Sequence, residues 1–294
     1  MRKIGHSQNF IRNPQVLESL VRDSSISKND LVIEIGAGDG EITKILSKYS
    51  KEVIAIEKDK KLYKKLFNDL KNKSNVKILN TDIFKLHFPT SKSYKVFSNI
   101  PFNYTADIVR LLTEQQNLSE DIYLFVQKQA ALNYFGRPKT KESLKSLFTK
   151  LHFKAFIVHQ FKRGDFRPVP KVDIVLLRLK KLSQPLLSKT KTANWKDFVV
   201  YAFSQTKPSL KEGLGRIFTA KQFDKISKDL KIKPKSKPKD LSLKQWLGLY
   251  NFFDTDVDKN RKNFVNNSYH QLLRQQKSLK KIHRTRIDKD WREK

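Results

Sequence analysis

The chain contains no cysteine among its 294 residues. It therefore has no disulfide, no thiolate zinc site, no iron–sulfur cluster and no cysteine nucleophile. No apolar run reaches the roughly 18 residues of a membrane-spanning helix, and the N-terminal segment lacks the apolar stretch of a secretory signal. We therefore expect a cytoplasmic protein without a membrane-spanning segment.

Histidines are few and acidic residues are outnumbered. The six histidines show no H-E-x-x-H spacing, so no metal site is predicted. There are 29 Asp plus Glu against 61 Lys plus Arg, a net charge of +32. Such an excess predicts a polyanionic partner and favours nucleic acid. An anionic membrane surface and a generally lysine-rich surface remain alternatives. The net charge is +15 over residues 1–180, +10 over 181–254 and +7 over 255–294.

The first part of the chain, 1–184, alternates between strand and helix patterns. Apolar runs predict strands at 31–35, 53–56, 76–79, 94–97 and 122–126, with helices at 41–50, 62–70, 107–114 and 127–135 between and after them. This alternation is typical of an α/β doubly wound parallel sheet, as in Rossmann-like methyltransferases. Two later strands, 155–161 and 173–179, are predicted to form an antiparallel hairpin at the sheet edge.

The pattern changes after residue 184. Helical patterns at 195–203, 209–218, 223–230 and 243–253 predict a small all-α domain over 185–254, with Trp195 and Trp246 in its core. Residues 255–294 form a basic C-terminal tail with a weak apolar stripe at Val265, Tyr269, Leu272, Leu279 and Ile282. This stripe indicates either one helix or a segment that orders only on binding.

A glycine-rich loop follows the first of these predicted strands. The segment Glu34–Gly40 reads E-I-G-A-G-D-G, so its glycines are spaced G-x-G-x-G. A dinucleotide fingerprint would need a further glycine where Glu41 stands. The spacing therefore favours S-adenosylmethionine over NAD, although a purely structural turn is also possible.

Acidic residues follow the next two strands. Glu57 comes directly after strand 53–56, where a carboxylate can accept hydrogen bonds from ribose hydroxyls; this holds for NAD as well. Asp82 follows strand 76–79, where it can accept from an adenine amino group. A single acid after a strand is usually a solvated loop residue. Three acids near three successive strand ends instead favour a ligand-binding site.

The segment Asn99-Ile100-Pro101-Phe102 carries the chemistry. An exocyclic amine is a poor nucleophile because its lone pair is delocalised into the base. The Asn99 side-chain oxygen and a main-chain carbonyl held by Pro101 can accept hydrogen bonds from that amine, and Phe102 provides a face for stacking a flipped base. Methyl transfer from a sulfonium needs alignment, and no metal.

With these residues in view, the chain resembles the Erm-type 23S ribosomal RNA adenine-N6 methyltransferases. The segments that carry the resemblance are His6–Ile11, Glu34–Gly40, Glu57, Asp82, Asn99–Phe102, Phe166–Asp173, Asp197–Leu210 and Gln245–Leu247. The Phe166–Asp173 segment is also similar to one in the small-subunit rRNA dimethyltransferases.

The resemblance implies roles for individual residues. The implied cofactor-binding positions are Gln8, Asn9, Ile11, Gly36, Gly38, Glu57, Asp82 and Asn99. The implied catalytic positions are Asn99, Ile100, Pro101 and Phe102. Many relatives have Tyr where Phe102 stands, and stacking survives that change.

The implied function is mono- or dimethylation of an adenine N6 in 23S rRNA, with resistance to macrolide, lincosamide and streptogramin B antibiotics. S-adenosylmethionine is the expected cofactor, ribosomal RNA the expected partner in place of a membrane surface, and a monomer the expected state. Residues 185–254 are expected to bind RNA. One alternative is a 16S rRNA adenine dimethyltransferase, which shares the catalytic motifs. The other is a nucleic-acid-binding relative that has lost catalysis.

Overall fold

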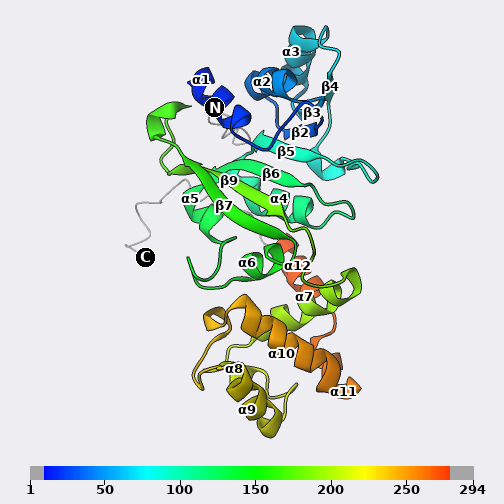
Figure 1. Ribbon diagram of the computed structural model, residues 1–294, viewed down its shortest axis with the longest axis vertical. Helices are drawn as coiled ribbons and strands as arrows, with labels where there is room; N and C mark the ends of the chain where they lie inside the picture. The colour runs from blue at the N-terminus through cyan, green and yellow to red at the C-terminus, as the bar shows by residue number, and fades with distance from the viewer. Residues whose placement is uncertain (1–9, 279–294) are drawn as a thin grey trace. The chain divides into compact units, whose positions relative to one another are not determined.

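Seven strands form one sheet in the order β4-β3-β2-β5-β6-β9-β7 (Figure 1). The computed structural model describes residues 10–278. The strands are β2 (Leu31–Ile35), β3 (Glu52–Ile56), β4 (Val76–Leu79), β5 (Lys95–Asn99), β6 (Asp121–Gln127), β7 (Phe153–Gln160) and β9 (Ile174–Lys181). The β4-β3-β2-β5-β6 pairings are parallel, and β9 runs antiparallel to both β6 and β7. The predicted doubly wound sheet and its antiparallel edge hairpin are confirmed.

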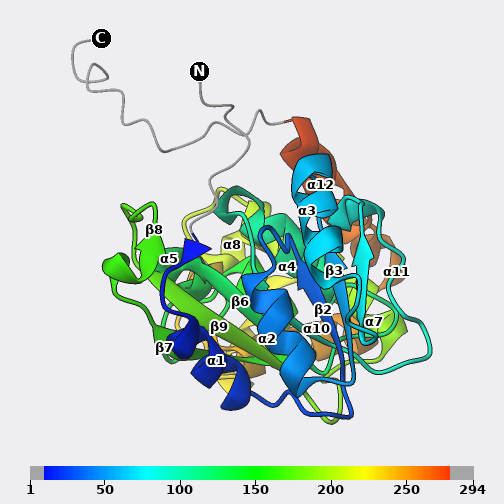
Figure 2. The ribbon, with the colours of Figure 1, turned by 90° about the horizontal axis from the view of Figure 1, so that it is seen from above.

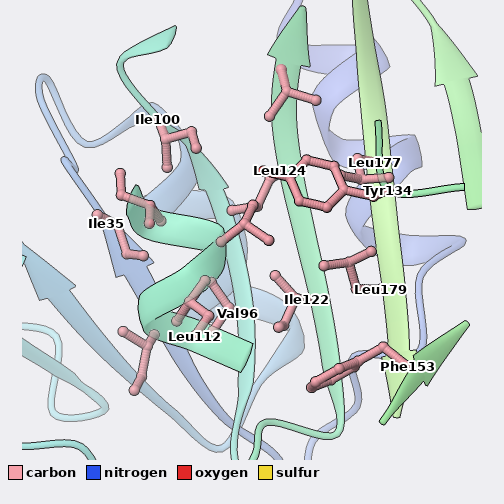
Figure 3. Close-up of a cluster of buried hydrophobic side chains, with 14 of the residues drawn as sticks. Ile35, Val96, Ile100, Leu112, Ile122, Leu124, Tyr134, Phe153, Leu177 and Leu179 are labelled. Carbon is pink, nitrogen blue, oxygen red and sulfur yellow. The ribbon is translucent and has the colours of Figure 1, made fainter. Parts of the chain in front are cut away.

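Helices cover both faces of this sheet, because the side chains of each strand alternate between the faces. One face packs against α1 (Pro14–Arg22), α2 (Glu41–Tyr49) and α3 (Lys60–Leu70). The other packs against α4 (Thr105–Thr113) and α5 (Lys128–Leu132). Figure 3 shows this second core, where Leu112 of α4 lies against Val96 and Ile122 of the central strands.

The strand order reverses between β2 and β5, which are adjacent in the sheet although β3 and β4 separate them in sequence. Their ladder pairs Val32 with Lys95 and Ile33 with Val96 and goes no further. Ser98 bridges the strands beyond that point: its hydroxyl accepts from the Ile35 N–H at 3.2 Å and donates to the Ile35 carbonyl. In open α/β sheets this carboxyl-end switch point is where ligands bind.

A second, two-stranded sheet joins distant parts of the chain. β1 (Phe10–Ile11) pairs antiparallel with β8 (Phe166–Arg167), and the Arg12 N–H donates to the Asp165 carbonyl at 2.7 Å. Figure 2 shows the blue β1 beside the green β8. Phe10–Ile11, the described part of the N-terminal motif, therefore pairs with the start of the Phe166–Asp173 segment.

The described chain divides into two compact units, 10–140 with 149–186, and 141–148 with 187–278. The second unit is helical. Its helices are α6 (Leu144–Thr149), α7 (Lys189–Ser204), α8 (Leu210–Gly213), α9 (Ala220–Asp229), α10 (Leu243–Asp256), α11 (Lys259–Lys262) and α12 (Ser268–Ser278). Its core is aromatic, with Phe198 stacked on Phe253 at 4.7 Å between ring centroids. Trp195 and Trp246 are fully buried, as predicted.

Two details of this unit differ from the sequence expectation. The helix predicted over 209–218 ends after one turn, at Gly213, because Gly213 and Gly215 both weaken a helix interior. The division of the chain also differs: residues 141–148 belong to the helical unit, and α10 runs two residues past Asp254.

The described part of the segment expected as a tail, 255–278, folds onto α7. Asp197 accepts hydrogen bonds from the Asn267 and Tyr269 N–H groups at 3.1 and 2.8 Å, and so caps α12. Tyr269 packs edge-to-face on Phe148 at 5.5 Å, and Val265 is buried in a short turn before the helix. The stripe is thus split by the turn at Asn267, which has a positive φ of 63°. Leu279 and Ile282 lie outside the described residues.

Candidate active site at the carboxyl ends of the central strands

The glycine loop between β2 and α2 turns sharply beside the end of β3. Gly36, Gly38 and Gly40 have φ values of 71°, 55° and 79°, in the region that glycine alone adopts without strain. The N–H groups of Gly36 and Ala37 both donate to the Ile56 carbonyl, at 2.8 and 3.0 Å. A β-carbon at Gly40 would collide with the Leu66 side chain of α3. The loop backbone is therefore held close to the end of β3, at the switch point of the sheet.

Glu57 is buried at the end of β3 and connects this loop to the next one. Its Oε2 accepts from the Gly38 N–H at 2.9 Å and its Oε1 from the Asp59 N–H at 2.8 Å. Each carboxylate oxygen retains a lone pair for another donor. Glu57 is thus oriented by backbone groups and can still accept hydrogen bonds from a diol.

Asp82 follows β4 and caps a single 3₁₀ turn, Ile83–Lys85. Its Oδ1 accepts from the Phe84 N–H at 3.1 Å, and its Oδ2 from the Lys58 ammonium at 2.7 Å. Burial would raise its pKa, but the hydrogen bonds from Lys58 and Phe84 and the Lys58 charge outweigh it and hold the pKa of Asp82 below its usual range. Asp82 is therefore an ionised acceptor at neutral pH.

Glu34, inside β2, is in the opposite electrostatic state. Burial raises the pKa of Glu34 to about 8, opposed by a hydrogen bond from the Thr43 hydroxyl and reinforced by the Glu57 charge. A carboxyl with this pKa is mostly protonated at pH 7, so it can donate as well as accept. Glu34, two residues before the first glycine, therefore differs in protonation from Asp82.

Two cavities meet at Gly36, which lines both. The smaller is lined by Ile11, Leu17, Glu34, Gly36, Ala37, Asp39, Glu41, Ile42 and Asn99. The larger, about 670 Å³, is lined by Ile35, Gly36, Ile56, Glu57, Lys58, Asp59, Lys60, Thr81, Asp82, Ile83, Phe84, Pro101, Tyr104 and Ile108. Glu57 and Asp82 supply polar acceptors, while Ile83 and Pro101 supply apolar surface for a flat ring.

This pair of cavities fits S-adenosylmethionine. The larger offers acceptors for a ribose and an adenine amine, and the smaller lies beside Asn99 and polar groups suited to an amino acid. A cofactor spanning both would pass over Gly36, where no side chain intervenes.

Asn99 is the last residue of β5, and a single 3₁₀ turn, Phe102–Tyr104, follows shortly after it. Ile100 is buried, whereas Asn99, Pro101 and Phe102 are half-buried. The Phe102 ring rests on the core beneath α1 and α2, and Asn99 lines the smaller cavity. The structure therefore brings Asn99, Glu34, Ile11 and Gly36 together, with Pro101 on the larger cavity. Gln8 and Asn9 lie outside the described residues.

Several residues of these cavities were not singled out from the sequence, among them Leu17, Lys58, Phe84 and Tyr104. Leu17 comes from α1, whose start carries an ordinary signal: Asn13 caps the Gln15 and Val16 N–H groups and Pro14 occupies the first turn. Lys58, Phe84 and Tyr104 line the larger cavity, and the last two form a ring pair at 6.0 Å between centroids. These two gave no sequence signal, because their contact depends on how two loops meet.

Within residues 10–278, no group of three or more His, Asp or Glu side chains is arranged to hold a metal ion. The same part of the chain has no helix long and apolar enough to span a membrane.

Comparison with known proteins decides the family. A sequence model of the family described as "Ribosomal RNA adenine dimethylase" matches residues 2–255. The chain belongs to the ribosomal RNA adenine dimethylase family. It is an rRNA adenine-N6 methyltransferase, and its cofactor is S-adenosylmethionine.

The relatives of this chain carry two kinds of name. "Ribosomal RNA small subunit methyltransferase A" of Mycoplasmopsis pulmonis is 30% identical over 83% of this chain and 95% of its own length. "rRNA adenine N-6-methyltransferase" of Bacillus licheniformis is also 30% identical, over 83% of this chain and 84% of its own. The solved structure of 23S rRNA methyltransferase ErmE has a TM-score of 0.74 at 23% identity, covering 84% of this chain and all of that one. The ErmE match supports the fold.

Proposed function

We propose that this enzyme methylates the N6 of an adenine in 23S rRNA, once or twice, and so protects ribosomes from macrolide, lincosamide and streptogramin B antibiotics. The observation that carries the adenine chemistry is the Asn99–Phe102 segment at the end of β5, beside both cavities. The preference for 23S rRNA rests on the His6–Ile11 and Asp197–Leu210 segments, which resemble Erm-type enzymes.

In the proposed mechanism, the side-chain oxygen of Asn99 and the Ile100 carbonyl accept hydrogen bonds from the adenine amine. This localises the nitrogen lone pair for in-line attack, and alignment supplies most of the catalysis. Pro101 restrains the turn that presents the carbonyl, and Phe102 stacks on the flipped base. The bound cofactor supplies an electrophilic methyl on a sulfonium.

Glu57 and Asp82 are proposed to bind the ribose and the adenine amine of the cofactor. The backbone N–H donors to Glu57 and the ionised state of Asp82 support these roles. Ile11, Gly36 and Gly38 line or shape the same path, and Gln8 and Asn9 are proposed to bind the methionine end. The helical unit is proposed to hold RNA phosphates through its lysines.

A 16S rRNA substrate is the second candidate. It is favoured by the Mycoplasmopsis pulmonis relative, which is as similar as the Bacillus licheniformis one and matches over 95% of its length.

The test is methylation of purified 23S and 16S rRNA with methyl-labelled S-adenosylmethionine, followed by nucleoside analysis. We expect N6-methyladenosine or N6,N6-dimethyladenosine in 23S rRNA, and none with an Asn99→Ala variant. Label confined to 16S rRNA would refute the 23S assignment. Expression in a susceptible bacterium should also raise the inhibitory concentration of a macrolide, which a 16S enzyme would not do.

A further inference from the structure

Lys58 lies at the rim of the larger cavity, next to the carboxylate proposed for the adenine amine. Its ammonium donates to Asp82 Oδ2 at 2.7 Å, while the Phe84 N–H donates to Oδ1 at 3.1 Å. The carboxylate is thus held from two sides, by the loop after β3 and by the turn after β4. A carboxylate offers about four lone-pair sites, so acceptor capacity remains on both oxygens.

Folding stability alone does not account for this ion pair. The Lys58 side chain is 75% exposed and that of Asp82 is 23% exposed. A pair with one partner so exposed contributes little to folding. Both side chains nevertheless line the cavity, as do the exposed rings of Phe84 and Tyr104.

Other charged and titratable groups face this pair from each neighbouring element. Lys85, on the 3₁₀ turn that Asp82 caps, adds a positive charge near Asp82 without a hydrogen bond to it. Tyr104, from the turn after β5, faces Lys58. Lys58 and Lys85 carry the same charge but differ in geometry, since only Lys58 of the two directs a donor at Oδ2.

We propose that Lys58 is a positioning residue for the cofactor: it holds the Asp82 carboxylate so that its remaining lone pairs meet the adenine amine. The inference rests on the proposed role of Asp82 as the adenine acceptor. The hydrogen bond from the Phe84 N–H fixes the position of Oδ1, and the hydrogen bond from Lys58 fixes the position of Oδ2.

The test is calorimetric binding of S-adenosylmethionine to the full-length chain, across a pH series, with single and double variants. Lys58→Met should weaken binding by roughly two- to fivefold at pH 7.5, the range for a partly exposed charge pair. Lys58→Arg should restore most of the affinity, because a guanidinium can donate to the same oxygen. Lys85→Met, which removes a charge without a hydrogen bond, should change binding less.

The pH series separates positioning from a general structural effect. Lys58 lowers the pKa of Asp82, so its removal raises that pKa towards the ordinary value. Affinity falls as pH falls through the pKa of Asp82, and in Lys58→Met this fall should begin at a higher pH than in the wild type.

The double variant separates this proposal from the one it rests on. In an Asp82→Asn background, Lys58→Met should cause no further loss. Additive losses, unchanged binding of Lys58→Met, or an equal effect of Lys85→Met would each overturn the role of Lys58. Unchanged binding of Asp82→Asn would instead overturn the adenine role of Asp82. Neither result depends on which rRNA is methylated.

Discussion

At the carboxyl ends of β2, β3 and β4, the first unit presents three carboxyl groups, those of Glu34, Glu57 and Asp82, around the two cavities. The helical unit presents the opposite chemistry. Residues 181–254 carry a net charge of +10, and the lysines of the run from Lys231 to Lys239 alternate with other residues. A sulfonium cofactor with ribose and amine donors needs acceptors, whereas RNA phosphates need cations. The comparison supports the proposal that recognition of the polyanion and methyl transfer use different residues in different units.

The strongest test of this division is Asn99→Ala. Removing the amide acceptor should lower kcat/KM for methyl transfer by about 100-fold or more, the usual cost of one catalytic hydrogen bond. Affinity for the cofactor should stay within a few-fold, because Glu57 and Asp82 remain. Filter-binding of labelled RNA product gives the rate, and calorimetry gives the affinity. A variant with wild-type turnover would contradict the assigned role.

Phe102 tests whether stacking, as distinct from hydrogen bonding, matters at the target base. Phe102→Ala should cost about 1–3 kcal/mol in base positioning, measured from kcat/KM with an RNA hairpin. Phe102→Tyr is the matched control and should be nearly silent, since the ring face is kept. An equal loss in both variants would mean that the ring packs structurally against the core below it.

Ser98 tests the link between the two central strands. Ser98→Ala leaves the buried Ile35 N–H and carbonyl without the partner that the hydroxyl provides. We expect a loss of about 1–3 kcal/mol in the free energy of unfolding, measured by urea titration, together with weaker cofactor binding. Ser119→Ala is the control. It removes an equally buried hydroxyl, which donates to the carbonyl of Tyr94 at the amino end of β5. Ser119→Ala should therefore lower the free energy of unfolding without weakening cofactor binding.

The smallest effect is expected on the basic face of α12. His270, Arg274 and Lys277 are exposed there at helical spacing. Changing Arg274 and Lys277 to Gln should reduce the slope of log K for RNA binding against log salt by about 1 to 2. Substitution is preferable to deletion, because deletion would uncover the α7 residues that α12 packs on.

A charge-matched control for this variant is Lys28→Gln with Lys51→Gln, near the amino ends of β2 and β3. That pair should leave the slope unchanged. If both double variants lower the salt slope equally, then the positive charge that contacts RNA is not confined to the helical unit, and the comparison between the units fails.

The local features of the fold were predictable from sequence. β2 and β4 have the predicted bounds, and α2 begins at the residue after the glycine loop, as expected. Such features depend on alternation of apolar residues and on glycine conformation, which neighbouring residues determine. The first helix was missed although Asn13-Pro14 marks its start, because the apolar stripe that follows is short.

The candidate site was predictable to the extent that each residue lies at a strand end. Glu57, Asp82 and Asn99 follow parallel strands, and such ends lie on one edge of the sheet. The contacts that orient them were not predictable. The Lys58 ammonium on Asp82 joins residues 24 apart, and the Ser98 hydroxyl on Ile35 joins residues 63 apart.

The sequence by itself therefore determined the strand–helix alternation, the glycine loop and the place of Asn99–Phe102 at a strand end, because these depend on residues close together in the chain. Tertiary structure alone decided that β1 pairs with β8, that Asp197 caps α12, and that Glu34 has a raised pKa while Asp82 has a lowered one. The physical reason is that pairing, burial and charge are set by what packs around a residue. Two carboxyl groups that are alike in the sequence become a mostly protonated acid and an ionised acceptor through their different surroundings.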